Sequence, residues 1–322
     1  MIPRIIHYCW FGRTPKNDLI QNCIASWQKF FPEFEIIEWN EENIDINNHE
    51  FMRICYEERK WAYVADYARL LALKEYGGIY FDTDMEIIKS FPKKLFNYDF
   101  FAGEEVAGQV SCGIIGANPN NPTISELIDY YDQIILLEPI PVLLKEILVK
   151  QAKMNAPSYY IAEPEIFYPK KYSGEIGTLE NSLTIHHWEG SWKKEKNTFF
   201  SNFIKKRKCD FSEEEEDLLI NIQTSSLLTT SELKAYEKLI QKHRNTINDK
   251  LKMNLENKFE RHKIAYINNT FIDPQQFSVT TIKDAIINPY LKGFPFMFFV
   301  KIIIKGLINL KKVNDRKSNS NS

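Results

Sequence analysis

Residues Gly77–Asp84, GGIYFDTD, decide the fold of this chain. Glycine readily adopts the left-handed backbone that ends helices, so the pair at the start of this stretch predicts a helix stop. The next three residues, Ile79–Phe81, are apolar and β-prone, and the carboxylates of Asp82 and Asp84 follow them directly. The stretch therefore predicts a helix, a tight turn and a buried strand with acidic side chains at its end.

The segments on both sides of this stretch predict an α/β sheet. Glu58–Tyr76 is rich in alanine and leucine and predicts a helix. Earlier in the chain, two β-prone runs, Ile2–Trp10 and Glu35–Trp39, flank a helical run at Leu19–Phe30. Strand, helix, strand is the order in which α/β nucleotide-binding folds begin. Later strands are expected at 99–102, 109–117 and 183–188, with a helix from about Thr123.

Composition changes after about residue 200, where charge runs at 205–208 and 213–216 follow the last expected strand. The spacing Thr229-x-x-Glu232 predicts a capping box that opens a helix to about residue 247. We therefore expect an α/β domain over 1–208, a mostly helical region over 209–315 and a disordered tail over 316–322. The net charge of −2 gives no sign of nucleic-acid binding.

The cysteines and the N-terminus favour a cytoplasmic protein. There are five cysteines, far apart and without a C-x-x-C pair, which argues against a disulfide framework or a zinc cluster. The first residues lead into a short apolar run and not into the long apolar stretch of a signal peptide. A reducing compartment is the simplest expectation.

The carboxylates of Asp82 and Asp84 suggest a metal site. At strand spacing, both side chains would leave the chain on the same side, at the end of a strand where α/β sheets bind ligands. Two like charges so close need a counter-charge, which Mg²⁺ or Mn²⁺ supplies. Such an ion could also bind the phosphates of a nucleotide diphosphate. An ordinary acidic turn is the alternative reading of these residues.

Asp66 and Arg69 lie three residues apart on the preceding helix and share a face. The compact helix, Gly-Gly, strand connection could bring this face near Asp82. An aspartate accepts hydrogen bonds from sugar hydroxyls, and an arginine holds phosphate or sugar oxygens in a forked geometry. An intrahelical ion pair is the alternative.

Taken together, these residues resemble a known signature. Ala65–Arg69 (ADYAR) followed by Gly77–Asp84 resembles glycosyltransferase family 32. That family contains bacterial capsular-polysaccharide sugar transferases and fungal mannosyltransferases, and the glucosylating clostridial toxins share its core. The opening Ile2–Gly12 (IPRIIHYCWFG) is similar to the start of the bacterial members, and the resemblance covers roughly residues 1–195.

The resemblance implies a GT-A-type fold with a mixed central sheet, a retaining reaction and a divalent metal. By position, the resemblance assigns base stacking to Trp10 and contact with the donor sugar to Asp66 and Arg69, while Tyr80 would line the site. It assigns contact with ribose or metal to Asp82 and direct metal ligation to Asp84. Relatives often carry serine where this chain has Ala65, a difference that bears on donor preference.

The segment from His186 to Trp192 (HHWEGSW) offers further ligands. On a strand, the rings of His186 and His187 face opposite ways, so one of them could join the aspartates around Mn²⁺. His186 is slightly favoured over His187 as the ligand. Ser191 and Trp192 could donate hydrogen bonds to phosphate oxygens, and a Gly-Ser-Trp ending is typical of the family. An aromatic-rich strand and turn is the alternative.

The expected function is transfer of a hexose from a nucleotide-sugar, UDP favoured over GDP, to an oligosaccharide in bacterial surface-polysaccharide assembly. A sugar-nucleotide pyrophosphorylase would need a glycine-rich phosphate loop, which residues 11–15 do not supply. A non-catalytic carbohydrate-binding or scaffold protein, and a transferase acting on a protein acceptor, stay open. Glu104 and Glu105 could approach the sugar, but the pattern identifies no nucleophile.

The C-terminal segment 291–312 combines apolar residues with lysines. This composition suits a helix lying in a membrane surface, and equally a helix packed on the domain. Attachment to a membrane would be useful with a lipid-linked acceptor. The expected location is cytoplasmic, with peripheral attachment to the inner face of the cytoplasmic membrane as the membrane-bound option.

Overall fold

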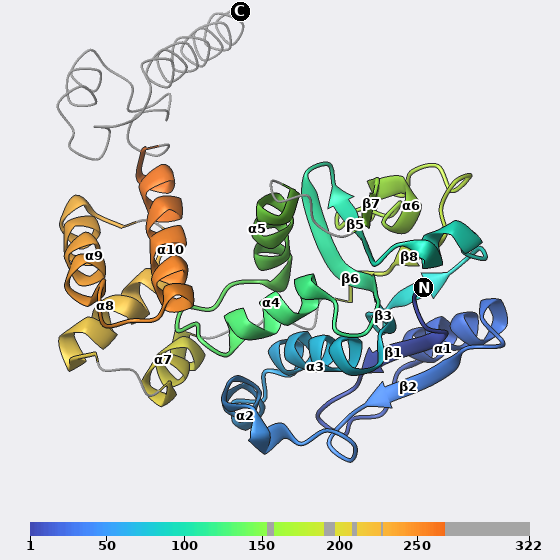
Figure 1. Cartoon of the computed structure of the whole chain (residues 1–322), viewed down its shortest axis with the longest axis horizontal. Coiled ribbons are helices and arrows are strands. Elements are labelled where there is room, and N and C mark those ends of the chain that lie inside the picture. Colours follow the sequence, from blue (N-terminus) through green and yellow to red (C-terminus); the bar gives the residue numbers. More distant parts are fainter. Residues whose placement is uncertain (153–157, 190–196, 208–210, 227, 268–322) are drawn as a thin grey trace, which may run out of the picture. The chain divides into compact units, whose positions relative to one another are not determined.

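The computed structural model describes residues 1–152, 158–189, 197–207, 211–226 and 228–267 (Figure 1). It divides the chain into two compact units, Met1–Lys208 and Cys209–Ser322. Ser191 and Trp192, the segment 291–312 and the tail 316–322 lie outside the described residues, so the expectations for them stay predictions.

The first unit is built on a six-stranded mixed sheet with the strand order β2-β1-β3-β6-β5-β7. The strands are β1 (Ile5–Cys9), β2 (Glu35–Trp39), β3 (Gly78–Phe81), β5 (Phe100–Val106), β6 (Gln109–Ala117) and β7 (Tyr159–Ala162). The central strand β3 runs parallel to β1 and antiparallel to β6. The predicted α/β class with a mixed central sheet is thereby confirmed.

A separate two-stranded antiparallel sheet pairs β4 (Met85–Ile87) with β8 (Thr184–His186). The helices of the first unit are α1 (Asp18–Phe30), α2 (Glu50–Glu57), α3 (Trp61–Tyr76), α4 (Pro122–Tyr131), α5 (Ile140–Ala152), α6 (Pro164–Phe167) and α7 (Asn197–Lys206). Short 3₁₀ turns occupy Ile46–Asn48 and Lys93–Asn97. Figure 1 shows α3 running alongside the parallel part of the sheet.

The helix predicted over Glu58–Tyr76 begins at Trp61, and a further helix, α2, precedes it. The helices are separated because α2 ends in a Schellman motif: the amide of Lys60 donates to the carbonyl of Cys55, and that of Arg59 to Tyr56. Arg59 takes the left-handed position with φ 56°. Glycine usually fills that position, so an arginine there carries no local signal of this break.

The predicted stop at the end of α3 is confirmed. Gly77 and Gly78 have φ angles of 62° and 101°, and the amide of Gly77 donates to the carbonyl of Leu73. Gly78 also lies against β1, where an added Cβ would be 2.6 Å from the carbonyl oxygen of Ile5. The turn that feeds β3 into the sheet therefore requires glycine for conformation and for space.

Replacing Gly78 with alanine is expected to lower the free energy of unfolding by more than about 2 kcal/mol, because backbone strain and a backbone clash act together. Gly108→Ala is the matched control, since its φ is 79° but an added Cβ would meet nothing within 4 Å. Strain alone should cost the control roughly 1 kcal/mol. Chemical denaturation measures both variants, and equal losses would contradict the role of the contact with Ile5.

The aromatic core of the first unit also fixes the start of β4. The Trp27 ring on α1 stacks on Phe81 with 5.4 Å between centroids, and its indole N–H donates to the carbonyl of Met85 at 2.6 Å. Ser26 accepts a hydrogen bond from the amide of Ile87. Helix α1 therefore holds the segment that carries Asp84, which connects core packing to the position of an acidic side chain.

The second unit is helical, with α8 (Glu213–Thr224), α9 (Thr230–His243) and α10 (Asp249–Ile267). The predicted capping box of Thr229 and Glu232 is confirmed at the start of α9. A second one, of Ser212 and Glu215, opens α8. Among the described residues, no helix has the length and apolar character needed to cross a membrane.

Candidate functional site

Asp82 and Asp84 lie in a turn and not in a strand. Strand β3 ends at Phe81, and the amide of Met85 donates to the carbonyl of Asp82 at 3.0 Å, which closes the turn. The amide of Asp82 donates to Gly113 on β6 and so ties the turn to the sheet. The strand spacing assumed for these aspartates was therefore wrong, and the turn is what brings their carboxylates together.

His186 completes a cluster with the aspartates. It ends β8 and pairs with Met85 of β4, which sets its side chain beside Asp84. Its Nε2 lies 3.0 Å from Oδ1 of Asp84. One ligand atom each from Asp82, Asp84 and His186 lies within 4.8 Å of the others, and we call these residues the Asp–Asp–His cluster.

The cluster has the chemistry of a divalent metal site. Carboxylate oxygens suit Mg²⁺ and Mn²⁺, and an imidazole nitrogen suits Mn²⁺. The Asp84 side chain is 11% exposed and that of His186 is 9% exposed, so water is largely kept from these groups. The Nδ1 atom of His186 is buried with no hydrogen-bond partner among the described residues. The residues present therefore fit the ion that the sequence predicted.

Asp84 is held ready as an ionised ligand. Burial acts to raise the pKa of this carboxyl, but the hydrogen bonds from His186 and from the amide of Glu189 outweigh it, and the pKa lies below its ordinary value. The amide of Glu189 donates to Oδ2 of Asp84 at 2.9 Å. Backbone N–H groups favour the charged form in this way.

Arg69 connects Asp66 to the cluster. Its guanidinium lies 2.7 Å from Oδ1 of Asp66 and 3.2 Å from Oδ1 of Asp82, and it donates to the carbonyl of Cys112. It also lies over the Tyr80 ring, whose hydroxyl donates to Asp82 at 3.0 Å. The expected approach of the helix face to Asp82 is therefore observed, with Arg69 bridging two carboxylates.

One buried cation compensates these two carboxylates only in part. Burial raises the pKa of Asp66 to about 6, the Arg69 charge acts against that rise, and the Asp82 charge adds to it. Arg69 is 5% exposed and engaged with protein groups. Its observed contacts position Asp66 and Asp82, while its direct contact with a donor sugar stays a prediction.

Trp10 lies at the same sheet edge as the cluster. It follows β1, which is parallel to β3 in a register that pairs His7 with Tyr80. Its ring is half-buried, its indole N–H donates to the carbonyl of Thr14, and Lys16 lies 5.4 Å from the ring centroid. Trp10 is therefore partly exposed at the end of the sheet that carries the aspartates, and base stacking on it stays a prediction.

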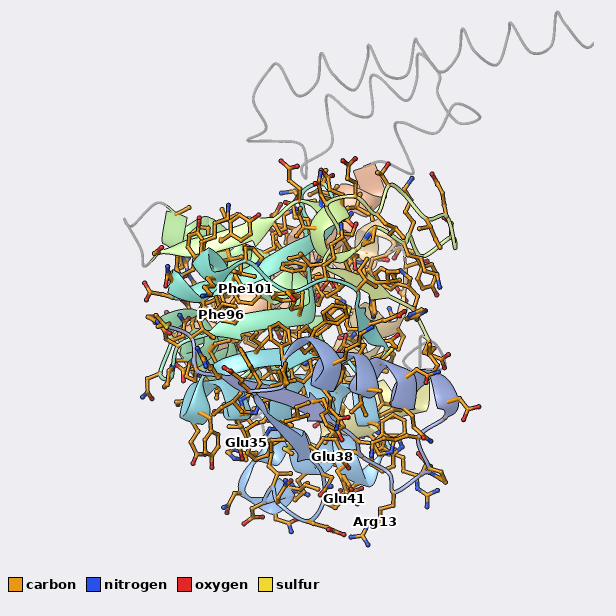
Figure 2. All side chains as sticks on the ribbon, turned by 90° about the vertical axis from the view of Figure 1, so that its right-hand side faces the viewer. Arg13, Glu35, Glu38, Glu41, Phe96 and Phe101 are labelled. Atoms are coloured by element: carbon orange, nitrogen blue, oxygen red, sulfur yellow. The ribbon has the colours of Figure 1, made fainter. Side chains whose placement is uncertain are left out.

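The loop after Trp10 is fixed by acidic residues at the end of β2. Glu38 forms an ion pair with Lys16 at 2.7 Å, and Glu41 accepts a hydrogen bond from the amide of Gly12. Figure 2 shows Glu38, Glu41 and Arg13 at the same end of the molecule. These contacts hold the loop that presents Trp10.

The two histidines face opposite ways, as expected for a strand. Nε2 of His187 lies 2.9 Å from Oε2 of Glu86, away from the cluster. Of the pair, the structure brings only His186 to the aspartates and does not bring His187 there. Ser191 and Trp192, which follow in the chain, lie outside the described residues.

Aromatic rings and a glycine also shape the site. The ring centroid of Trp188, from the segment HHWEGSW, lies 4.0 Å from that of His186, and the ring centroid of Tyr168 lies 5.7 Å from it. An added Cβ at Gly113 would lie 3.1 Å from Oδ2 of Asp82, so a small residue leaves room for that carboxylate. Tyr168 and Gly113 are distant in sequence from the residues they contact and carry no local sequence signal.

Glu105 lies close to the cluster. Burial raises the pKa of its carboxyl, while the His186 charge and a hydrogen bond with Ser111 act in the opposite direction. Ser111 on β6 is buried, and the register of β5 on β6 sets Gly103 opposite it. The sequence raised Glu105 as a residue that could approach the sugar, and its role stays open.

Comparison with known families supports a relationship to glycosyltransferases. Residues 17–101 match the model of the family described as "Glycosyltransferase sugar-binding region containing DXD motif". The match includes Asp66, Arg69, Asp82 and Asp84. The narrower assignment to family 32 stays a prediction.

A curated relative agrees with this family match. An uncharacterized glycosyltransferase of Acanthamoeba polyphaga mimivirus is 30% identical over 135 residues. The alignment covers 38% of this chain and 52% of that protein, so the chain spans about half the length of the curated relative it matches.

Solved structures with a similar fold include three glycosyltransferases. The PaToxG glycosyltransferase has a TM-score of 0.38 and 19% identity, over 47% of this chain and 70% of that one. A glycosyltransferase involved in the glycosylation of the major capsid of PBCV-1 has a TM-score of 0.34 and 11% identity, over 62% and 99%. The ligand-free glycosyltransferase domain from the YGT toxin has a TM-score of 0.34 and 11% identity, over 81% and 97%.

Proposed function

We propose that this chain is a metal-dependent glycosyltransferase that moves a hexose from a nucleotide-sugar to a glycan acceptor. The Asp–Asp–His cluster carries the proposal, because it offers a divalent cation three ligand atoms within 4.8 Å of one another. Its aspartates also lie inside the segment that matches the sugar-binding DXD family model.

The ligands for Mn²⁺ or Mg²⁺ would be Asp82, Asp84 and His186. Bound there, the ion supplies a positive charge that stabilises the departing nucleotide diphosphate. Arg69 fixes Asp82 by ion pairing, and the backbone amide of Glu189 fixes Asp84. Both carboxylates are therefore oriented before any ligand binds, which lowers the cost of assembling the site.

The remaining residues orient the donor. Trp10 provides an aromatic face for the nucleobase at the edge of the sheet, where stacking contributes about 1–3 kcal/mol in other nucleotide sites. Asp66 accepts hydrogen bonds from hexose hydroxyls. The rings of Trp188 and Tyr168 pack around His186 and help to exclude water from the cluster.

The finer assignments belong to the same proposal. The donor is a UDP-sugar in preference to a GDP-sugar, the reaction retains the anomeric configuration, and the acceptor is an oligosaccharide of a bacterial surface polysaccharide. The protein acts in the cytoplasm, with segment 291–312 giving peripheral contact to the inner membrane face where the acceptor is lipid-linked. The assignments of reaction and acceptor rest on the resemblance to family 32, the location on the cysteine usage and the N-terminal sequence, and the membrane contact on the composition of segment 291–312.

A donor-hydrolysis screen tests the function directly. UDP- and GDP-sugars are incubated with the full chain and Mn²⁺, and released nucleotide diphosphate is measured. We expect turnover of one donor that stops when the metal is chelated. Calorimetric titration of UDP and GDP with and without Mn²⁺ accompanies the screen. Absent or metal-independent nucleotide binding would favour the scaffold alternative and contradict the proposal.

The adjacent histidines provide a matched pair of metal-ligand variants. His186→Gln is expected to weaken Mn²⁺ binding by about tenfold or more, because it removes an imidazole that faces Asp84. His187→Gln should leave the affinity unchanged, because His187 contacts Glu86 instead. Calorimetric titration with Mn²⁺ measures both proteins. Equal weakening in the two variants would rule out the assignment of His186 as the ligand.

A further inference from the structure

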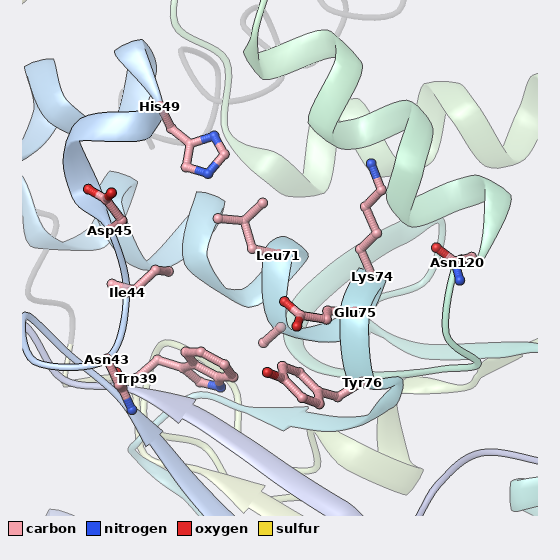
Figure 3. A pocket seen from close by; sticks show the side chains of 11 residues that line it. Trp39, Asn43, Ile44, Asp45, His49, Leu71, Lys74, Glu75, Tyr76 and Asn120 are labelled. Carbon is pink, nitrogen blue, oxygen red and sulfur yellow. The ribbon is translucent and has the colours of Figure 1, made fainter.

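A cavity of about 440 Å³ lies apart from the Asp–Asp–His cluster (Figure 3). Trp39 lines it from the end of β2, and Tyr76 lines it from the end of α3. Asp45 and His49 lie on the segment before α2, across from Glu75 of α3. A cavity of this volume is within the range of small-molecule sites.

Helix α3 separates the cavity from the cluster. Asp66 and Arg69 direct their side chains to the cluster from the middle of the helix. Glu75 follows Asp66 by nine residues, which is about two and a half turns or roughly 13 Å along the axis. The cavity therefore lies on another face and at the other end of α3, and it shares no residue with the cluster.

Two aromatic rings form the apolar part of the cavity. Trp39 and Tyr76 have ring centroids 5.7 Å apart. The indole N–H of Trp39 donates to Nδ1 of the buried His7, which holds the Trp39 ring in one orientation. Tyr76 is 39% exposed, so part of its ring remains open to a ligand. Such rings pack against the apolar C–H face of a molecule.

The polar lining of the cavity offers donors, on Lys74, Asn43 and Asn120, together with acidic and imidazole acceptors. Asp45 and Glu75 contribute carboxylates. The Tyr67 hydroxyl donates to Asp132 and lies 3.1 Å from Nδ1 of His49, so this nitrogen carries the proton in the neutral ring. Nε2 of His49 is then an acceptor. A matching ligand has several hydroxyl donors.

The charges of the cavity narrow the class of ligand. Two carboxylates and one lysine, Lys74, line the cavity, and this excess of negative charge disfavours phosphates and other anions. Within the part of the chain that the structure describes, the acidic and imidazole groups close enough to hold a metal ion are Asp82, Asp84 and His186, none of which lines this cavity. An uncharged molecule with hydroxyl donors and an apolar face fits the remaining chemistry.

We propose that this cavity is a second carbohydrate-binding site, which takes an uncharged oligosaccharide away from the donor. The binding does not require transferase activity. It also deepens the proposed function, because under that function the bound saccharide is a distal part of the acceptor glycan. A site of this kind would hold a growing chain while its terminal hydroxyl reacts elsewhere.

Binding of uncharged disaccharides to the full chain tests the second site. Maltose, lactose and N,N′-diacetylchitobiose are titrated without metal or nucleotide, using calorimetry and saturation-transfer NMR. We expect at least one to bind, Tyr76→Ala to weaken that binding by about tenfold or more, and Tyr76→Phe to retain it. Asp45→Asn should weaken binding, while Glu42→Gln removes the same charge from an exposed residue of the same loop and should not.

The outcomes separate this proposal from the proposed function. If no disaccharide binds, or if Asp84→Asn abolishes binding while Tyr76→Ala retains it, the second site is overturned. If UMP binds the unaltered chain and Tyr76→Ala abolishes that binding, the cavity takes nucleotides and the proposed carbohydrate class is wrong. If a disaccharide binds in the predicted manner and no donor is hydrolysed, the second site stands and the proposed function fails. Thermal melts of Tyr76→Ala and Tyr76→Phe confirm folding.

Discussion

Asp84→Asn is expected to reduce donor hydrolysis by at least about 100-fold, the largest effect on activity that the structure predicts. Asparagine keeps the size of the side chain and an oxygen that can accept from the amide of Glu189. It removes the negative charge that a dication needs, next to the imidazole of His186. Steady-state kinetics with Mn²⁺ and the donor identified in the screen measure the loss.

Glu86→Gln is the matched control for that substitution. Glu86 lies two residues further along the same segment, is 40% exposed at its side chain and faces His187. The control removes the same charge without touching the Asp–Asp–His cluster, so its activity should stay within about twofold of the unaltered chain. Equal losses in both variants would show that general charge, and not metal ligation by Asp84, accounts for the effect.

Arg69→Met is expected to have the largest effect on stability. The guanidinium is 5% exposed and ion-paired with Asp66 and Asp82. Removing it leaves the largely buried carboxylate of Asp66 and the partly exposed one of Asp82 without their counter-charge, which should lower the free energy of unfolding by about 3–5 kcal/mol. Arg53→Met breaks an exposed pair with Glu57 and should cost less than about 1 kcal/mol. Urea denaturation compares the two variants.

The deficit of Arg69→Met should depend on pH. In the unaltered chain, burial raises the pKa of Asp66 from 3.8 to about 6, and Arg69 opposes the rise. A carboxyl whose pKa is higher in the folded state destabilises the fold as pH rises through this window. Without Arg69 the window extends upward, so the deficit should be larger at pH 8 than at pH 5. A pH-independent deficit would show that lost packing, and not unpaired charge, is responsible.

Local sequence patterns predicted the strands and helix ends that neighbouring residues determine. Strands β2 and β6 have the predicted bounds because apolar runs bounded by turn residues define them. The stop at Gly77 follows from the conformational freedom of glycine. By contrast, Arg59 occupies a left-handed position without glycine, so the division between α2 and α3 had no local signal.

The candidate site was predictable where its residues are close in sequence. The helix face of Asp66 and Arg69 and the acidic pair after β3 could be read from spacing, and the structure brings them together. The turn at residues 82–85 could not be read, because short segments of strand and turn share the same residue types. The neighbours Tyr168 and Gly113 depend on strand pairing between distant parts of the chain.

The small β4–β8 sheet has a consequence for how the protein matures. It joins Asp84 to His186 across 102 residues, so the imidazole reaches the aspartates only after nearly all of the first unit has been synthesised and has folded. Closing so long a loop is entropically costly and slow. A partly made chain would hold both acidic side chains without the third ligand, and tight ion binding would therefore mark the pairing of β8 with β4. Manganese binding during refolding would then report when His186 reaches the aspartates.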